Sequence, residues 1–509
     1  PLNVDSTHAA NLVSDFDVAA ANEAEAVNKT EELIAFARGL DIDDLDKDGN
    51  TSEAREWLFG DALHSRPLPI NYGSYGSYTD PSNSAIYLAV ATNDGMLRMI
   101  RNTNPGGSES GEEVWAFMPR NAMKAQKTLR ANGSGMKHPY TVDGAPVALL
   151  QDRNFDGSIV ANDGDKVYLY VGMRRGGKAY YALDVTNPEK PSLMWTIEKS
   201  GDFAELGYTF SNPRVGLINS PNGPRAVVMF AGGYDMNKDT RGVVGTDDSE
   251  GNAIYIVDAE TGELIWKARG GNGGSATVFE HPQLVDSIPS TLAAADTDGD
   301  GLTDRIVVGD TGGNVWRADI QGPDTAEWKL TLLASLGRHT SGAMGIISDR
   351  RFFHRPDIVP SKDGNGMFDA VVIGSGNRPN PLDTDGMTVN FMFMLKDRHT
   401  APGSGVDENI QLNQLGDVTD NCLQSDTPCA VDLSKGWRLM LEEPGEKVLA
   451  TPLTLVGKVF FTSYLPQADG GATSCSPSEG SGRLYAVSLQ DATSVMNYDS
   501  SDDDPDNPD

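Results

Sequence analysis

Apolar segments recur along this chain in units of four, separated by polar loops and Gly-rich turns. Their short length and their content of β-branched and aromatic residues predict β-strands rather than helices. Each unit opens with an X-Pro pair, and the pairs follow one another at intervals of 67 to 96 residues. The six pairs are Arg66-Pro67, Ala145-Pro146, Asn212-Pro213, Ile288-Pro289, Arg355-Pro356 and Thr451-Pro452.

The clearest unit spans residues 225–233, 253–258 and 263–267. Five successive units carry a tryptophan at the fourth-strand position: Trp115, Trp195, Trp266, Trp328 and Trp437. Four short antiparallel strands cannot bury both faces alone, whereas stacking such units around an axis gives them a shared core. The pattern predicts an all-β fold, a modified β-propeller with six visible blades. The long interval between Pro356 and Pro452 has room for a degenerate seventh blade, or residues 401–432 within it form a surface loop.

Three regions follow from this organisation. Residues 1–58 are expected to form an N-terminal helix and an acidic loop that link to an absent upstream domain, and residues 59–498 to form the propeller. Residues 499–509 are acidic and Pro-containing, which predicts a disordered tail. The helix is expected over residues 30–38, with Asn28 or Thr30 as N-cap and Gly39 as its stop.

The composition narrows the classes of function. Apolar residues make up 39% of the 509 residues and 55 are glycines, which is typical of a globular chain with many tight turns. A formal net charge of −32 repels polyanions, so nucleic-acid binding is not expected. The sequence has no apolar run long enough for a membrane-spanning segment. It also starts without a basic and apolar leader, so we expect any secretion signal to lie upstream or to have been removed.

The most specific motif is the acidic stretch from Asp296 to Asp304. Asp296, Asp298 and Asp300 occupy the first, third and fifth positions of an EF-hand-like loop, with a glycine at the sixth. Leu302 falls at the seventh position, which offers a backbone carbonyl, and Asp304 closes a loop shorter than the EF-hand. Carboxylates this close repel one another unless a cation lies between them, so the motif predicts a Ca²⁺ site.

A second metal candidate precedes the propeller. Asp44, Asp46 and Asp48 repeat the spacing, and Asn50 supplies the seventh-position carbonyl. The twelfth position is an arginine, so closure requires Ser52, Glu53 or water, and we expect a lower affinity than at the Asp296 loop. Two weaker candidates, at residues 152–157 and 363–366, lack the full set of carboxylates and are equally typical of ordinary turns.

Other residue types give weaker signals. Three cysteines are too few for a disulfide scaffold, but a bridge between Cys422 and Cys429 would close a polar loop; the alternative is that both, with Cys475, are reduced. His64 either lines a central channel or is a hydrogen-bonded structural histidine. The sequence contains no nucleophile elbow, Walker loop or zinc-protease motif.

Further motifs occur in a fixed order: Leu33 to Gly39 before the first acidic loop, Gly60-Asp61, His64-Ser65-Arg66-Pro67, Asn93-Asp94-Gly95-Met96-Leu97, Trp115-Ala116-Phe117-Met118-Pro119 and Gly445-Glu446-Lys447-Val448. With the Asp296 loop, this set resembles the C-terminal domain of the PilY family over most of residues 30–490. PilY proteins are type IV pilus-associated factors with a modified propeller domain.

The resemblance implies a non-enzymatic, calcium-binding pilus biogenesis factor and surface adhesin that regulates pilus extension, retraction and twitching motility, with roles in surface sensing and virulence. It implies pilin or minor pilins, and a host or abiotic surface, as partners. It also implies export to the cell surface or pilus tip, with a periplasmic or outer-membrane-associated pool. Carried over by position, the calcium ligands are Asp296, Asp298, Asp300, the Leu302 carbonyl and Asp304. The chain has no Arg-Gly-Asp tripeptide, so that route to integrin binding is absent.

Two alternatives stay open. The repeat around residues 252–266 resembles the blades of quinoprotein dehydrogenases, which also use calcium, although those enzymes usually carry an adjacent cysteine pair and no Cys-Cys occurs here. In the other alternative the calcium is a purely structural element of one blade, and loops elsewhere provide adhesion.

Overall fold

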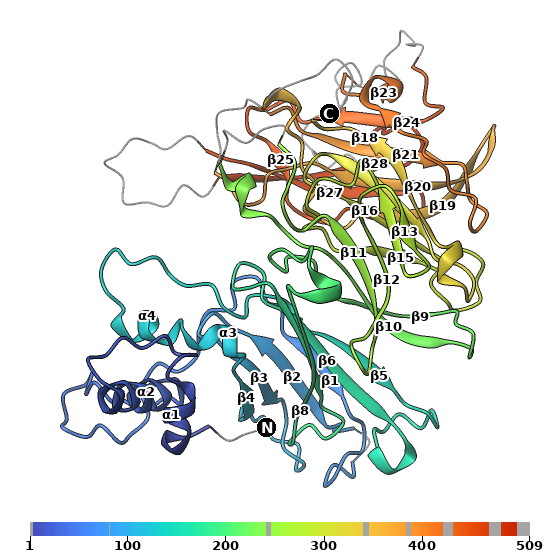
Figure 1. The fold of residues 1–509 in the computed structure, drawn as a ribbon. Helices are drawn as coiled ribbons and strands as arrows, with labels where there is room; N and C mark the ends of the chain where they lie inside the picture. Colours follow the sequence, from blue (N-terminus) through green and yellow to red (C-terminus); the bar gives the residue numbers. More distant parts are fainter. Residues whose placement is uncertain are drawn as a thin grey trace, which may run out of the picture. The chain divides into compact units, whose positions relative to one another are not determined.

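The computed structural model describes residues 4–80, 82–240, 246–338, 346–382, 388–420, 431–467 and 480–495. Two compact units divide the chain. The first comprises Pro1–Ala204, Tyr208–Val215 and Ala259–Gly262, and the second Glu205–Gly207, Gly216–Asp258 and Glu263–Asp509. Figure 1 shows that strands dominate both units, which confirms the predicted all-β class.

Within the described ranges the α-helices all belong to the first unit, and the second unit has only short 3-10 helices (Figure 1). The α-helices are α1 (Ala9–Leu12), α2 (Glu23–Ala37), α3 (Arg120–Met123) and α4 (Gln126–Ala131). The long helix α2 packs against α1 and α4. Among the residues that the structure describes, no helix combines the length and the apolar character needed to cross a bilayer.

The predicted start of the long helix was wrong. The N-cap is Asn22, whose side chain accepts a hydrogen bond from Glu25 N, rather than Asn28 or Thr30. Thr30 lies inside the helix and its hydroxyl donates to Ala26 O at 2.8 Å. The predicted stop is confirmed, because Gly39 follows the helix with φ +92°, a conformation that glycine adopts without strain.

Two four-stranded antiparallel sheets complete the first unit. One consists of β1 (Leu68–Asn71), β2 (Ile86–Ala91), β3 (Leu97–Arg101) and β4 (Glu113–Phe117). The other consists of β5 (Val147–Gln151), β6 (Lys166–Gly172), β7 (Ala179–Asp184) and β8 (Ser192–Glu198). Strands that follow one another in sequence are neighbours in each sheet, as in a propeller blade.

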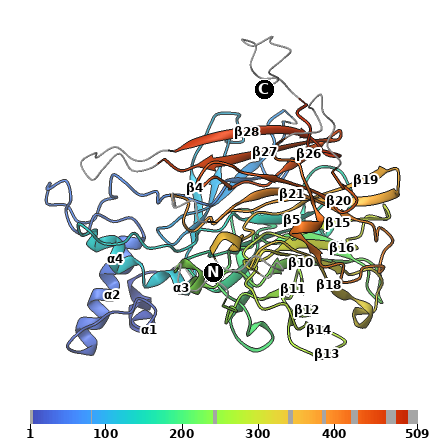
Figure 2. The same cartoon turned by 90° about the horizontal axis from the view of Figure 1, so that it is seen from above.

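The second unit holds four sheets, although Arg214 and Val215, the first two residues of its first strand, are assigned to the first unit. The first sheet joins β9 (Arg214–Ile218), β10 (Arg225–Ala231), β11 (Ala253–Asp258), β12 (Leu264–Gly270), β13 (Gly274–Ser275) and β14 (Val278–His281). The next joins β15 (Ala293–Ala295), β16 (Arg305–Gly309), β17 (Asn314–Asp319), β18 (Lys329–Ser335) and β22 (Ile410–Gln411). The third joins β19 (Asp357–Asp363), β20 (Gly366–Gly374), β21 (Phe391–Asp397), β24 (Gly436–Met440) and β23 (Gly416–Asp417). The last joins β25 (Lys447–Val448), β26 (Leu453–Leu455), β27 (Lys458–Leu465) and β28 (Ser481–Ser488), of which β27 and β28 run side by side in Figure 2.

The X-Pro pairs mark the strand starts as predicted. In five of the six units a strand begins directly after the proline, and β15 begins four residues after Pro289. In the last sheet the short strand β25 precedes Pro452. Proline has no N–H to donate to a neighbouring strand, so it is tolerated at the start of a strand, before the hydrogen-bonded ladder begins. Four of the five predicted tryptophans lie in fourth strands, and Trp328 lies one residue before β18. Trp266 and Trp328 are buried together, with ring centroids 5.9 Å apart.

The described residues form six sheets. Between β21 and β24, where a seventh blade or a surface loop was expected, the described residues (398–420 and 431–435) add two short strands to existing sheets. β22 pairs in parallel with β18, and β23 pairs in parallel with β24. The described residues of this interval therefore widen two blades and form no separate sheet.

One half-buried carboxylate of the second unit predicts a pH dependence of stability. Glu205 accepts hydrogen bonds from Lys267 at 3.0 Å and from Arg269 at 2.7 Å. Burial alone would raise the pKa of Glu205, but the hydrogen bonds from these two cations hold that pKa below its ordinary value. A lowered pKa stabilises the fold above the pKa of an ordinary glutamate, and this contribution disappears as the pH falls through the lowered value.

We therefore expect Glu205→Gln to unfold at lower urea concentration than the parent chain at about pH 7, and the two midpoints to converge below about pH 3. Urea unfolding followed by tryptophan fluorescence across this range measures the difference. A difference that stays constant with pH would contradict the assignment.

Candidate metal-binding loops

The Asp296 loop connects β15 to β16 in the second unit. Asp296, Asp298 and Asp300 are exposed, and one carboxylate oxygen from each lies within 4.8 Å of the others. The structure thus brings together the three carboxylates that the spacing singled out.

Backbone hydrogen bonds give this loop its shape. Asp296 accepts from Gly299 N at 2.6 Å and from Gly301 N at 2.8 Å. Asp298 and Asp300 each accept from the N–H two residues further on. The two glycines have φ of +85° and +88°, so the sharp turn costs them little.

The two remaining predicted ligands sit differently. Leu302 donates its N–H to Asp300 Oδ1 at 2.8 Å, which leaves its role as a carbonyl ligand a prediction. Asp304 is buried, and its Oδ2 accepts from Thr297 N at 2.8 Å and from Thr297 Oγ1 at 2.9 Å. Asp304 lies outside the tight group of three carboxylates. Sequence reasoning missed Thr297, although a hydroxyl residue between two acidic positions was a usable signal.

The carboxylates concentrate negative charge in the Asp296 loop and change one another's pKa values. Hydrogen bonds from the N–H groups of Gly301 and Gly299 lower the pKa of Asp296. Partial desolvation and the charges of the neighbouring carboxylates together raise the pKa of Asp298, although the hydrogen bond from Asp300 N acts to lower it. An all-oxygen donor set with excess negative charge fits a hard divalent cation such as Ca²⁺.

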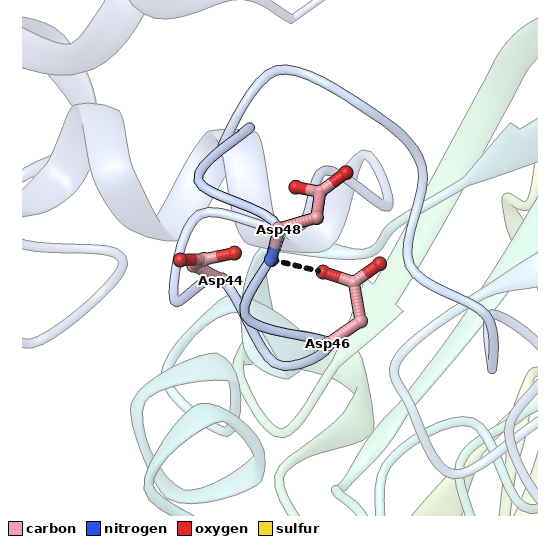
Figure 3. Close-up of side chains that lie close together, drawn as sticks. All are labelled: Asp44, Asp46 and Asp48. Atoms are coloured by element: carbon pink, nitrogen blue, oxygen red, sulfur yellow. Dashed lines mark hydrogen bonds between the residues drawn. The ribbon is translucent and has the colours of Figure 1, made fainter.

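The Asp44 loop has the same arrangement in the first unit. One oxygen from each of Asp44, Asp46 and Asp48 lies within 4.8 Å of the others. Figure 3 shows these side chains around a single turn, with Asp48 N–H donating to Asp46 Oδ1 at 3.2 Å. Asp44 accepts from Gly49 N and Asn50 N donates to Asp48, as at the equivalent positions of the Asp296 loop.

Glu53 lies close enough to these carboxylates for their charges to act on it. The charge of Asp48 is the first cause that raises the pKa of Glu53, ahead of burial and of the charges of other aspartates in the loop. Asn50 Nδ2 donates to Glu53 Oε2 at 3.3 Å. Of the three closures that the sequence left open, Glu53 thus lies near the loop, and its role as a ligand stays a prediction.

The structure distinguishes the two weaker metal candidates, at residues 152–157 and 363–366. The loop at residues 152–157 repeats the hydrogen bonds, since Asp152 accepts from Phe155 N and Gly157 N, but its third position is an asparagine. In the other loop Asp363 accepts from Lys396 at 2.9 Å and from Arg398 at 2.7 Å, and Arg398 foremost holds the pKa of Asp363 well below its usual range. These two cations already compensate Asp363, so we expect no metal there.

The structure describes the surroundings of His64 but not those of the cysteines. His64 Nδ1 lies 2.6 Å from Oδ2 of the buried Asp143, which supports the hydrogen-bonded structural role for this histidine. Cys422, Cys429 and Cys475 lie outside the described residues, as does the predicted tail from residue 499.

Comparison with known proteins supplies a family. The family described as "PilY1 beta-propeller domain" matches residues 65–329, just over half of the chain. A "Type IV pilus biogenesis factor PilY1 homolog" of Xylella fastidiosa is 26% identical over 432 residues, covering 82% of this chain and 27% of that protein. "Type IV pilus biogenesis factor PilY1" of Pseudomonas aeruginosa is 30% identical over 312 residues, covering 58% of this chain and 23% of that protein. The chain thus spans about a quarter of the length of these relatives.

A solved structure agrees in fold. The crystal structure of the Pseudomonas aeruginosa PilY1 C-terminal domain matches with a TM-score of 0.54 and 21% sequence identity. The match covers 80% of this chain and 79% of that domain. At this identity the likeness concerns the fold alone.

Proposed function

The chain belongs to the PilY1 β-propeller family, and from this premise we propose that it is a calcium-binding type IV pilus biogenesis factor and surface adhesin. It acts without catalysis, at the cell surface or pilus tip after export. Its partners are pilin or minor pilins, together with a host or abiotic surface. Calcium occupancy regulates pilus extension and retraction, and through them twitching motility.

The observation that supports calcium binding is the convergence of three exposed carboxylates on one turn of the Asp296 loop. Asp296, Asp298 and Asp300 would hold the ion with the Leu302 carbonyl and Asp304. When bound, Ca²⁺ supplies positive charge that compensates the repulsion among these carboxylates. The Asp44 loop would hold a second ion with Asp44, Asp46, Asp48 and Asn50.

The regulatory part of the proposal can be tested in cells. We expect Asp298→Ala to lower the number of surface pili and the twitching distance, because an empty loop favours retraction. Asp298 is the better position for this test than Asp304, because Asp304 is buried and accepts two hydrogen bonds from Thr297. Electron microscopy counts the pili, and immunoblotting confirms equal amounts of protein.

Asp46→Ala provides the matched comparison for the second loop. Normal piliation in both single variants and in the double variant would contradict regulation by calcium. Thermal melts in chelator address the structural alternative, since collapse of the propeller without calcium would identify the ion as a structural element.

A further inference from the structure

One stretch of the second unit extends from its own blade onto the blade that carries the Asp296 loop. Residues 398–411, named here the crossing segment, follow β21 and end in β22. β22 pairs in parallel with β18 at Ala334 and Ser335. The crossing segment thus joins the sheet of β15–β18 from outside.

The far end of the crossing segment is fixed to β18. Asp407 Oδ1 accepts from Leu332 N at 2.7 Å, and Asn409 N donates to Leu332 O at 3.0 Å. Ile410 is buried beside these bonds. Asp407 Oδ2 also lies 3.3 Å from His281 Nε2.

The near end rests on two buried arginines. Arg317 Nη1 donates to His399 O at 2.6 Å. Arg305 Nη2 donates to the carbonyls of His399, Thr400 and Ala401 at 3.1 to 3.4 Å. Both guanidinium side chains are 1% exposed, so these carbonyls replace water as acceptors.

Asp319 connects the arginines to the crossing segment. Its carboxylate lies 3.3 Å from Arg305 Nε and 2.7 Å from Arg317 Nη2. Gly405 N donates to Asp319 Oδ2 at 3.2 Å. A Cβ at Gly405 would lie 2.3 Å from that oxygen, so only glycine allows this close approach.

The same residues adjoin the calcium loop. Arg305 directly follows Asp304, the last proposed ligand. Ile320, which directly follows Asp319, donates its N–H to Asp304 O at 2.7 Å. A movement of the Asp304 backbone therefore acts on Arg305 through the chain and on Asp319 through this hydrogen bond.

We propose that calcium binding at the Asp296 loop and docking of the crossing segment are coupled through Arg305 and Asp319. This inference rests on the proposed function, because it takes the loop to be a calcium site. An ion that Asp304 helps to bind holds the backbone of Asp304 in the position seen in the structure. Calcium binding therefore favours the state in which both arginines hold the crossing segment. Linkage requires the reverse effect, so weaker docking of the segment lowers calcium affinity by the same factor.

Hydrogen exchange of the full chain tests the coupling, with peptides covering residues 398–411 followed in saturating Ca²⁺ and in chelator. We expect amide exchange in the crossing segment to be slower in Ca²⁺ by about fivefold or more. We expect Asp407→Ala to weaken calcium binding by a similar factor in calorimetry, although Asp407 lies outside the loop.

Asp324→Ala is the matched control. Asp324 also accepts a backbone N–H, that of Ala326, at the turn between β17 and β18 of the same sheet. We expect its calcium affinity to equal that of the parent chain. Circular dichroism establishes that both variants are folded.

The possible results separate the two proposals. Calcium binding with unchanged exchange of residues 398–411, or with unchanged affinity in Asp407→Ala, would overturn the coupling and leave the calcium site intact. Absence of calcium binding in the parent chain would overturn the calcium site, and the coupling with it.

Discussion

Replacing Asp298 with Ala is expected to weaken calcium binding at the Asp296 loop about 100-fold, because one carboxylate of an exposed site contributes about 3 kcal/mol to holding a divalent cation. The side chain is exposed, so water replaces it as acceptor for Asp300 N and the fold is retained. Isothermal titration calorimetry on metal-stripped protein measures the change.

Asp46 provides a matched control in the other loop. Asp46 and Asp298 both occupy the third position, and each accepts from the N–H two residues further on at 3.2 Å. We expect Asp298→Ala to remove the tighter of two binding events, Asp46→Ala the weaker one, and the double variant both. Isotherms of the single variants that match the parent chain would place the calcium elsewhere.

Replacing Arg317 with Met is expected to lower the free energy of unfolding of the second unit by about 3–5 kcal/mol, because it removes the cation paired with buried Asp397 and leaves buried Asp319 with Arg305 alone. Arg317 is 1% exposed and contacts Asp397 at 2.6 Å and Asp319 at 2.7 Å. Burial alone would lower the pKa of Arg317, but these two aspartates raise it, so the guanidinium stays charged. Urea unfolding followed by circular dichroism measures the loss.

Arg225→Met is the control for an exposed ion pair. Arg225 contacts Asp258 at 2.8 Å in the same unit, but its side chain is 39% exposed. Solvent screens such a pair, so we expect a loss of about 1 kcal/mol or less. Equal losses in the two variants would show that burial is not what makes the Arg317 network strong.

Sequence patterns predicted the strands well and one helix boundary badly. The prolines before β1, β5, β9, β19 and β26 and the tryptophans of the fourth strands mark positions that local geometry dictates. The helix start failed because Asn28 and Thr30 are also good capping residues. Residues 23–29 favour a helix, and Asn22 caps them first.

The candidate site divides in the same way. Spacing alone located the carboxylates of the Asp296 and Asp44 loops, because their hydrogen bonds join residues no more than five positions apart. The pairing of Asp363 with two cations could not be predicted, because Lys396 and Arg398 lie 33 and 35 positions further along the chain. Nor could the burial of Asp304, which depends on the sheet around it.

By itself, the sequence determined the repeating strands, the family resemblance and the acidic loops, because each depends on residues close together in the chain. Only the tertiary structure decided which charges are paired and where the crossing segment lies. Arg305 meets Asp369 and Ala401, 64 and 96 positions further on. Such pairs form because burying an arginine is costly unless acceptors surround it, and the fold alone brings those acceptors together.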